Sequence, residues 1–252
     1  MLDLIRHDDI LELKLARPPV NALNPELLVR LRDAISAAPG DGVRGLVISG
    51  GPGVFSAGLD VPRLLTMQRG DLEAAWREFF GVLEVLARSP LPSVAAIAGH
   101  SPAGGAVIGL FCDYRVMARG PYRIGLNEVQ VGLIVPECIQ YALRRLVGTY
   151  RAERLLVAGA MIEAEQAHAI GFVDELVDID HVTARALAWL RELLALPGKA
   201  MHTTRGIARA DLVEAIADPA RLDLPRFLDE WYSEETQAVL GALVARLKSK
   251  AG

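Results

Sequence analysis

The uncharged run from Leu91 to Cys112 constrains the fold of this chain more than any other segment, with His100 counted as neutral. A stretch this apolar either crosses a membrane or lies inside a globular domain. Its centre, GHSPAGG at 99–105, excludes the first reading, because a bilayer would leave the backbone groups of a turn unpaired. We therefore predict a buried strand over Ser93–Ala98, a glycine-rich turn, and a buried helix from Pro102 to Leu110.

The composition supports a globular protein with a large aliphatic core. The chain has 252 residues, 52% of them apolar, and a formal net charge of -4. This composition excludes disorder, and the balance of 27 basic against 31 acidic residues argues against a nucleic-acid partner.

The start of the chain, MLDLIRHDDI, lacks the apolar run of a signal peptide. Cys112 and Cys138, the two cysteines, are expected to be small buried hydrophobes in a reducing compartment, so we expect a cytoplasmic protein.

Strands and helices alternate through residue 177, which indicates an α/β domain. The run Leu196-Pro197-Gly198 then separates residues 1–196 from a helical region, 197–252. Predicted strands are Ile10–Leu15, Val43–Ser49, Cys112–Ala118, Tyr122–Gly125 and Phe172–Val177; predicted helices are one capped by Asn24, one over Asp71–Ala87 and an amphipathic one over Leu224–Leu247.

Two glycine-rich turns are the main functional signal. Each follows an apolar strand and leads toward a helix: Phe55–Asp60 (FSAGLD) and Pro102–Gly105 (PAGG). Free N–H groups at a helix start attract an anion, and two converging donors would form an oxyanion hole. Neither turn fits a nucleotide-binding fingerprint. Either turn alone is also explained by close packing of its glycines.

Two glutamates lie in the mostly apolar segment that follows. Glu128, in GLNEVQVGLI, is either an exposed charge at a helix start or a partly buried base whose pKa is raised by desolvation. Glu137 follows Pro136 and has a stronger structural interpretation, as a residue of the first helical turn.

These motifs resemble a known family. RPPVNAL, FSAGLD, SPAGGAVIGLFCDYR and IGLNEVQVGLIVP, in this order and spacing, are similar to the crotonase superfamily of enoyl-CoA hydratases and isomerases, and most similar to its mitochondrial-type enoyl-CoA delta isomerases. The resemblance covers nearly the whole chain. It implies an α/β fold, a spiral of ββα turns with two sheets, followed by C-terminal helices that mediate assembly into homotrimers or hexamers.

The resemblance also implies roles for individual residues. The oxyanion hole would be formed by the backbone N–H groups of Leu59 and Gly104, with the thioester carbonyl of an acyl-CoA as their acceptor. CoA is then part of the substrate, and no separate cofactor or metal is implied. The segments that line the CoA groove of the family contain Arg17, Ala22, Ser56, Ala57 and Asp60, and a C-terminal basic residue, Lys248 or Lys250, would contact the CoA phosphates.

One departure from the hydratase pattern bears on the reaction. Family hydratases use two glutamates to hold and activate water, and Val107 stands at the first of these positions while Glu128 stands at the second. A single base suffices to move a double bond. The resemblance therefore favours an isomerase that converts a 3-enoyl-CoA to a 2-trans-enoyl-CoA in fatty-acid oxidation, with Glu137 as a candidate second acid.

Two alternatives stay open. Glu137 substitutes for the missing glutamate in a hydratase or a thioester hydrolase, or the chain is a non-catalytic acyl-CoA-binding subunit. His100 and His168 lack neighbours at metal-ligand spacing and are expected to have packing or capping roles. The length of the acyl group is not specified by these motifs.

Overall fold

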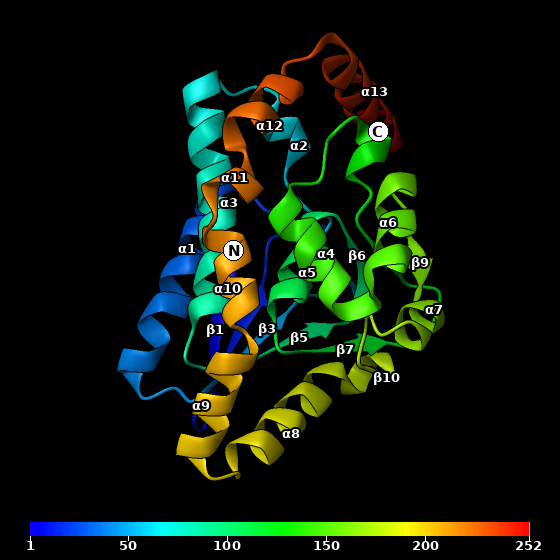
Figure 1. Ribbon diagram of the computed structural model, residues 1–252. Helices are drawn as coiled ribbons and strands as arrows, with labels where there is room; N and C mark the ends of the chain where they lie inside the picture. Colours follow the sequence, from blue (N-terminus) through cyan, green and yellow to red (C-terminus); the bar gives the residue numbers. More distant parts are fainter. Residues whose placement is uncertain (252) are drawn as a thin grey trace.

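A computed structural model of the chain describes residues 1–251, and the side chains of Lys248, Lys250 and Ala251 lie outside the described part. The larger of its two sheets has six strands in the order β1-β2-β3-β5-β7-β10 (Figure 1). Within this sheet, β1 and β2 pair antiparallel, as a hairpin, and the other neighbouring strands pair parallel. The strands are β1 Leu2–His7, β2 Ile10–Leu15, β3 Gly45–Ser49, β5 Ser93–Ile97, β7 Tyr114–Ala118 and β10 Glu175–Val177.

A second sheet of four short strands lies beside the first. Its order is β4-β6-β8-β9, with β4 Gly53–Val54, β6 Gly99–Pro102, β8 Arg123–Gly125 and β9 Ile162–Glu163. The chain three times passes from a strand of the large sheet to one of the small sheet and then into a helical segment. These repeats, β3-β4, β5-β6 and β7-β8, bring the ends of the small-sheet strands close together. The two predicted glycine turns and the Glu128 segment follow these ends.

The uncharged segment forms the middle repeat. All residues of β5 and of the helix α4 Gly104–Phe111 are buried. The predicted strand and helix are therefore confirmed, but residues 99–102 form a strand rather than a turn, and the helix begins at Gly104 instead of Pro102. The difference arises because β6 is stabilised by β4 and β8, which are distant in sequence. Within residues 1–251, no helix has the length and apolarity needed to cross a bilayer.

The large sheet is covered on both faces. Because side chains alternate along a strand, Leu46 and Ile48 of β3 enter the main core while Val47 points to the other face. There Val47 packs with residues of α8, the helix that lies along one side of the sheet in Figure 1. The remaining longer helices pack mainly around the opposite core. The helices are α1 Pro25–Ala37, α2 Val61–Leu64, α3 Arg69–Arg88, α5 Glu137–Val147, α6 Thr149–Ala158, α7 Ala164–Ala169, α8 Val182–Leu194, α9 Gly198–Ala208, α10 Ala210–Ala217, α11 Pro219–Leu222, α12 Leu224–Trp231 and α13 Glu234–Ala251; three short 3₁₀ turns are η1 Ala38–Asp41, η2 Glu128–Val131 and η3 Ile179–His181.

Two other predicted elements differ more strongly from the structure in extent. The single helix predicted over 224–247 is divided into α12 and α13, because the chain turns at Tyr232 and Ser233. The strand predicted over 172–177 is limited to Glu175–Val177, while Phe172 and Val173 are buried in the main core. Strands β1, β4 and β9 were not predicted. Side chains of α10, α12 and α13 belong to the same hydrophobic core as side chains from residues 1–196.

The start of α1 gives a first testable prediction. Asn24 caps the helix as the sequence indicated, with its side-chain oxygen accepting from Leu27 N–H at 3.0 Å. Asn24→Ala is expected to lower the free energy of unfolding by about 1 kcal/mol, because that N–H loses its partner in a buried position. Urea unfolding measures the change. Ser36→Ala, at the exposed end of the same helix, should stay within about 0.5 kcal/mol of the unsubstituted protein, and an equal loss in both variants would contradict the capping role.

Candidate active site

The first glycine turn is fixed by backbone contacts with the segment before α1. Leu23 N–H donates to Gly58 O at 2.8 Å, and Asp60 N–H donates to Leu23 O at 3.0 Å. Inside the turn, the Ser56 hydroxyl accepts from Gly58 N–H at 3.1 Å, and Gly58 has a φ of +81°. Leu59 N–H lies between these bonds and has no hydrogen-bond partner in the described part of the chain. The turn therefore presents one free amide.

The second turn is the junction between β6 and α4. Ala103 has a φ of +46°, an unusual conformation for a residue with a Cβ, and its N–H donates to Gly125 O at 2.9 Å. Strain of this kind costs about 1–3 kcal/mol and is concentrated at functional sites. Gly104 follows as the first residue of α4, where an amide has no intrahelical acceptor. A second free amide is thus placed at a helix start.

The two turns touch through their backbones. A Cβ placed on Gly58 would lie 3.2 Å from Gly104 N, and one placed on Gly104 would lie 3.5 Å from Leu59 N. Glycine at both positions is what permits this approach. The predicted oxyanion residues Leu59 and Gly104 are therefore neighbours in space, although they lie 45 positions apart in the sequence.

Glu128 begins the η2 turn, just after β8. The residue is partly buried, and its Oε2 atom is buried with no hydrogen-bond partner among the described residues. Burial away from water raises the pKa of Glu128 from 4.5 to about 7. A carboxyl with such a pKa exchanges protons readily near neutral pH, as a general base requires.

A cavity of about 640 Å³ joins the two turns and Glu128. Of the residues predicted for the site, Arg17, Ala22, Ala57, Leu59, Asp60, Gly104 and Glu128 line it. Ser56 does not; it is fully buried and holds the first turn through Gly58 N–H and Asn21 O. The sequence prediction missed several other lining residues, among them Asn127, Gln130 and Arg246.

The polar part of the cavity wall includes an ion pair. The Arg17 guanidinium donates to Asp60 Oδ2 at 2.6 Å and to Ala22 O at 3.0 Å. Asp60 also caps α2. The charges of Arg17 and Asp60 are therefore paired with each other within the protein. Arg246 of α13 lines the cavity with Leu243 and Leu247, at the spacing of one helix face. The side chains of Lys248 and Lys250, expected to contact CoA, lie outside the described residues.

The apolar part of the wall combines aliphatic side chains with four aromatic ones. Trp76 and Phe79 of α3 and Phe227 and Trp231 of α12 line the cavity and pack against one another, with ring centroids 4.3 Å apart for Trp76 and Phe227. An aromatic wall next to polar groups suits a ligand with one polar and one hydrocarbon part. The helical spacing of these residues does not distinguish a cavity wall from a core, because both have the same periodicity.

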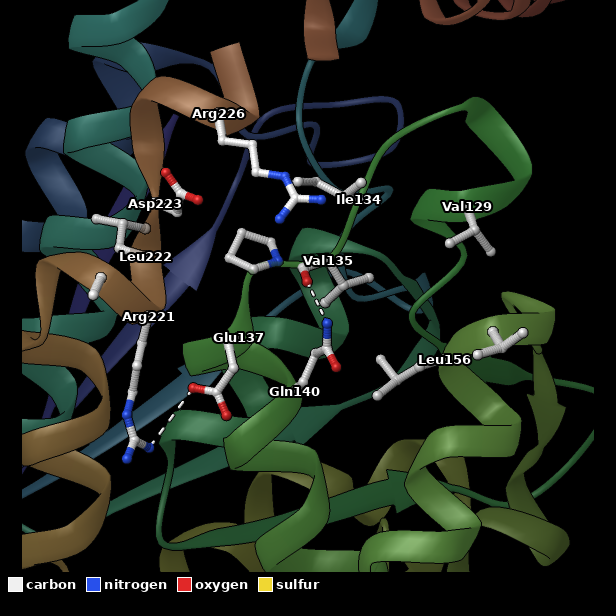
Figure 2. Close-up of a pocket in the computed structure, with 13 residues that line it drawn as sticks. Val129, Ile134, Val135, Glu137, Gln140, Leu156, Arg221, Leu222, Asp223 and Arg226 are labelled. Carbon is white, nitrogen blue, oxygen red and sulfur yellow. Dashed lines mark hydrogen bonds and ion pairs between the residues drawn. The ribbon is translucent and has the colours of Figure 1, made fainter. Parts of the chain in front are cut away.

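Glu137 lies outside this cavity. It faces a neighbouring cavity of about 360 Å³, where its carboxylate pairs with Arg221 at 3.7 Å (Figure 2). The same carboxylate also pairs with Arg144. Ile134 and Pro136 line both cavities, so the segment 134–136 separates Glu137 from the Glu128 cavity. Glu137 is the first residue of α5 and lines the smaller cavity, whereas Glu128 lines the larger one. The structure does not bring the two predicted acids together.

The other singled-out residues have packing positions. Val107 is buried in the main core and does not line the cavity. His100 accepts from Arg123 N–H at 3.1 Å and packs edge-on against Tyr122, as expected for a packing or capping residue. Cys112 and Cys138 are buried thiols, with pKa values raised to about 12 by desolvation. Among the described residues, no group of three or more His, Cys, Asp or Glu side chains is arranged to hold a metal ion.

Comparison with known proteins gives the same family throughout. A family model described as enoyl-CoA hydratase/isomerase matches residues 6–244. Human mitochondrial enoyl-CoA delta isomerase 1 is 32% identical over 243 residues, which cover 95% of this chain and 80% of that protein. A probable enoyl-CoA hydratase of Mycobacterium avium is 34% identical over 197 residues, covering 77% and 75%.

Solved structures confirm the expected fold. The crystal structure of human mitochondrial delta3-delta2-enoyl-CoA isomerase has a TM-score of 0.94 at 30% identity, covering 100% of this chain and 99% of that one. The predicted crotonase-like architecture, two sheets followed by C-terminal helices, is therefore correct. The names of the relatives include both isomerases and hydratases, so the reaction must be argued from the site.

Proposed function

The chain belongs to the enoyl-CoA hydratase/isomerase family, and from this premise we propose that it is an enoyl-CoA isomerase converting 3-enoyl-CoA to 2-trans-enoyl-CoA. One observation carries the choice of reaction. The carboxyl groups on the described cavity wall are Glu128 and Asp60, and Asp60 is paired with Arg17. Of these two carboxylates on the described wall, Glu128 is the one without an internal ion pair, which suits a reaction that needs a single base.

The proposed reaction uses three groups. The thioester oxygen accepts hydrogen bonds from Leu59 N–H and Gly104 N–H, while the Glu128 carboxylate removes a proton from C2. The electrons of that C–H bond delocalise over the C3–C4 double bond and the carbonyl, giving a dienolate whose oxygen is stabilised by the two amides. Glu128 then returns the proton to C4, so the double bond ends between C2 and C3. No atom is gained or lost overall.

Hydration and thioester hydrolysis fit the site less well. Both need an activated water, and the second acid proposed for that role, Glu137, is held by arginines in the neighbouring cavity. Val107, at the other candidate position, has no proton-accepting group and lies in the core. A non-catalytic binding subunit would not require a free carboxylate next to two unpaired amides.

The experiment that tests the proposal follows three products. Purified protein is incubated with 3-hexenoyl-CoA, and the conjugated 2-trans-hexenoyl-CoA is followed by its ultraviolet absorbance. Parallel reactions with 2-trans-hexenoyl-CoA and hexanoyl-CoA are analysed for 3-hydroxyhexanoyl-CoA and for free CoA. Isomerisation without hydration or hydrolysis supports the proposal, while a hydrated or hydrolysed main product contradicts it. A series of 3-enoyl-CoA lengths in the same assay measures the depth of the aromatic pocket.

The pKa of Glu128 predicts the pH dependence. Only the deprotonated carboxylate accepts the C2 proton, so kcat/KM is expected to rise with pH and to reach half its plateau near pH 7. Initial rates with subsaturating 3-hexenoyl-CoA, measured on both sides of neutrality, give the profile. A profile that is flat across neutral pH, or that falls as pH rises, would exclude Glu128 as the base.

Assembly and location are part of the proposal. We assign residues 197–252 to homotrimer or hexamer formation, which exposed apolar side chains near the start of this region support: Leu196 is 52% and Ile207 74% exposed in the single chain. We also propose a cytoplasmic enzyme of fatty-acid oxidation.

A further inference from the structure

The turn that carries Glu128 is fixed by contacts on two sides. Residues Glu128–Val131 form the 3₁₀ turn η2, which ends at Gly132 with a φ of +77°. A single 3₁₀ turn has few internal hydrogen bonds, so its orientation depends on its neighbours. The direction of the Glu128 carboxylate is therefore set by whatever holds residues 128–132.

The first support comes from α13. The Thr236 hydroxyl donates to Gly132 O at 2.6 Å, and Thr236 is only 2% exposed. Thr236 in turn accepts from the Ser233 hydroxyl at 3.0 Å, so a chain of two hydroxyl groups ends on the carbonyl of Gly132. The contact is close: a Cβ on Gly132 would lie 3.2 Å from Thr236 Cα.

The second support comes from the end of α6. Gln130 donates through Nε2 to Gly159 O at 2.9 Å. A Cβ on Gly159 would lie 2.8 Å from Val129 Cγ2 and 2.9 Å from Gln130 Cγ, so this contact is also tight. The η2 turn is thus packed between α6 and α13. Removing one support leaves the turn attached on the other side only.

We propose that Thr236 is a positioning residue, which orients Glu128 for proton transfer by holding Gly132. The proposal rests on the proposed function, in which Glu128 is the base. Thr236 is not among the cavity-lining residues, so it acts through the turn rather than on the substrate. Proton transfer is sensitive to such placement, because a displacement of about 1 Å can cost about 10²-fold in rate.

Replacement of Thr236 separates positioning from packing. Thr236→Val has nearly the same shape but no hydroxyl, and it is expected to lower kcat about tenfold, the kinetic equivalent of one lost hydrogen bond, with a smaller change in KM. Thr236→Ser keeps the hydroxyl and should keep most of the activity. Thr183→Val makes the same change in the first turn of α8, away from the cavity, and serves as the matched control.

A measurement without substrate distinguishes this inference from the proposed reaction. The pKa of the Glu128 carboxyl is read by carbon-13 NMR in ligand-free protein, with Glu128→Gln to assign the signal. Loosening the turn lets water reach Oε2, so Thr236→Val is expected to lower the pKa of Glu128 toward its ordinary value. The other charged groups on the cavity wall, Arg17, Asp60 and Arg246, are unchanged in the variant.

The outcomes are distinct. A variant Thr236→Val that melts at a lower temperature but keeps kcat and the pKa of Glu128 would show a merely structural residue and overturn the inference. Wild-type protein without isomerase activity would refute the proposed reaction, while the pKa comparison would still decide the role of Thr236. If Thr236→Val does not fold, Ser233→Ala serves instead, because it removes the hydroxyl that donates to Thr236. This variant is expected to change kcat and the pKa of Glu128 in the same directions but by less. No change in either quantity contradicts the inference.

Discussion

Glu128→Gln is expected to lower kcat/KM for 3-hexenoyl-CoA by about 10²- to 10⁴-fold, the usual contribution of a positioned base. Glutamine has the shape of glutamate but does not take up the C2 proton. The two amides of the proposed oxyanion hole are untouched, so binding of the acyl-CoA should persist and the loss should fall mainly on kcat. Steady-state kinetics of the purified variant measure both parameters.

Stability provides the control for this variant. The pKa of Glu128 is raised on folding, so the folded protein holds its proton up to about pH 7 while the unfolded chain releases it near 4.5. The wild-type protein therefore loses stability as pH rises through this window, and Glu128→Gln does not. Above pH 7 the variant is expected to be more stable than wild type by up to about 3 kcal/mol, and below pH 4.5 this difference should vanish. Low activity in a more stable protein excludes misfolding.

The same substitution at Glu137 tests the competing mechanism. Because its side chain is paired with Arg144 and Arg221 in the neighbouring cavity, Glu137→Gln removes ion pairs without changing the groups around Glu128. Full isomerase activity in Glu128→Gln together with its loss in a folded Glu137→Gln protein would reverse the assignment of the base.

Gly58→Ala is expected to lower kcat by about 10²- to 10³-fold, as when one oxyanion-hole donor is lost. The new Cβ would lie 3.1 Å from Ala103 Cβ and 3.2 Å from Gly104 N, so the two turns must separate. The amides of Leu59 and Gly104 would then no longer converge on one oxygen. The thioester in its ground state carries less charge on that oxygen, so KM should change less than kcat.

A second glycine supplies the matched control. Gly148, between α5 and α6, also has a φ of +81°, but a Cβ there has no atom within 4 Å. Gly148→Ala should therefore suffer only a conformational cost, seen in urea unfolding, while kcat stays unchanged. If Gly58→Ala loses only stability, to the same degree as Gly148→Ala, the convergence of the two turns is not used in catalysis.

Much of the fold follows from local sequence. The alternating residues of 10–15 form β2 with the predicted bounds, and Asn24 caps α1 as its type and position indicate. Strands β4 and β9 have two residues each, too few for any periodic signal, and exist because of their partners. The break between α12 and α13 was missed because the apolar stripe continues across Tyr232 and Ser233. Packing, rather than propensity, fixes these elements.

The candidate active site could be predicted from the sequence motifs to a similar extent. The motifs identified Leu59, Gly104 and Glu128, and the structure brings all three to one cavity. They did not show that Glu137, nine residues after Glu128, lines a different cavity, because spacing along the chain does not say which cavity a side chain enters. Nor did they show Arg246, which reaches the cavity through the packing of α13. Separation in sequence therefore does not tell which residues line the same cavity, either at the start of a helix or where a helix distant in sequence packs against the site.

The position of α13 has a consequence for how the protein is made. The atoms proposed for catalysis belong to residues 59, 104 and 128, which leave the ribosome early, whereas part of the cavity wall and the hydroxyl that holds the η2 turn belong to α13. A nascent chain that has reached Trp231 contains the base and both amides but lacks these supports. Synthesis therefore completes the proposed catalytic pocket only once α13 has been made, and a chain that stops at Trp231 would carry the proposed reactive groups without the part of the cavity wall that α13 supplies.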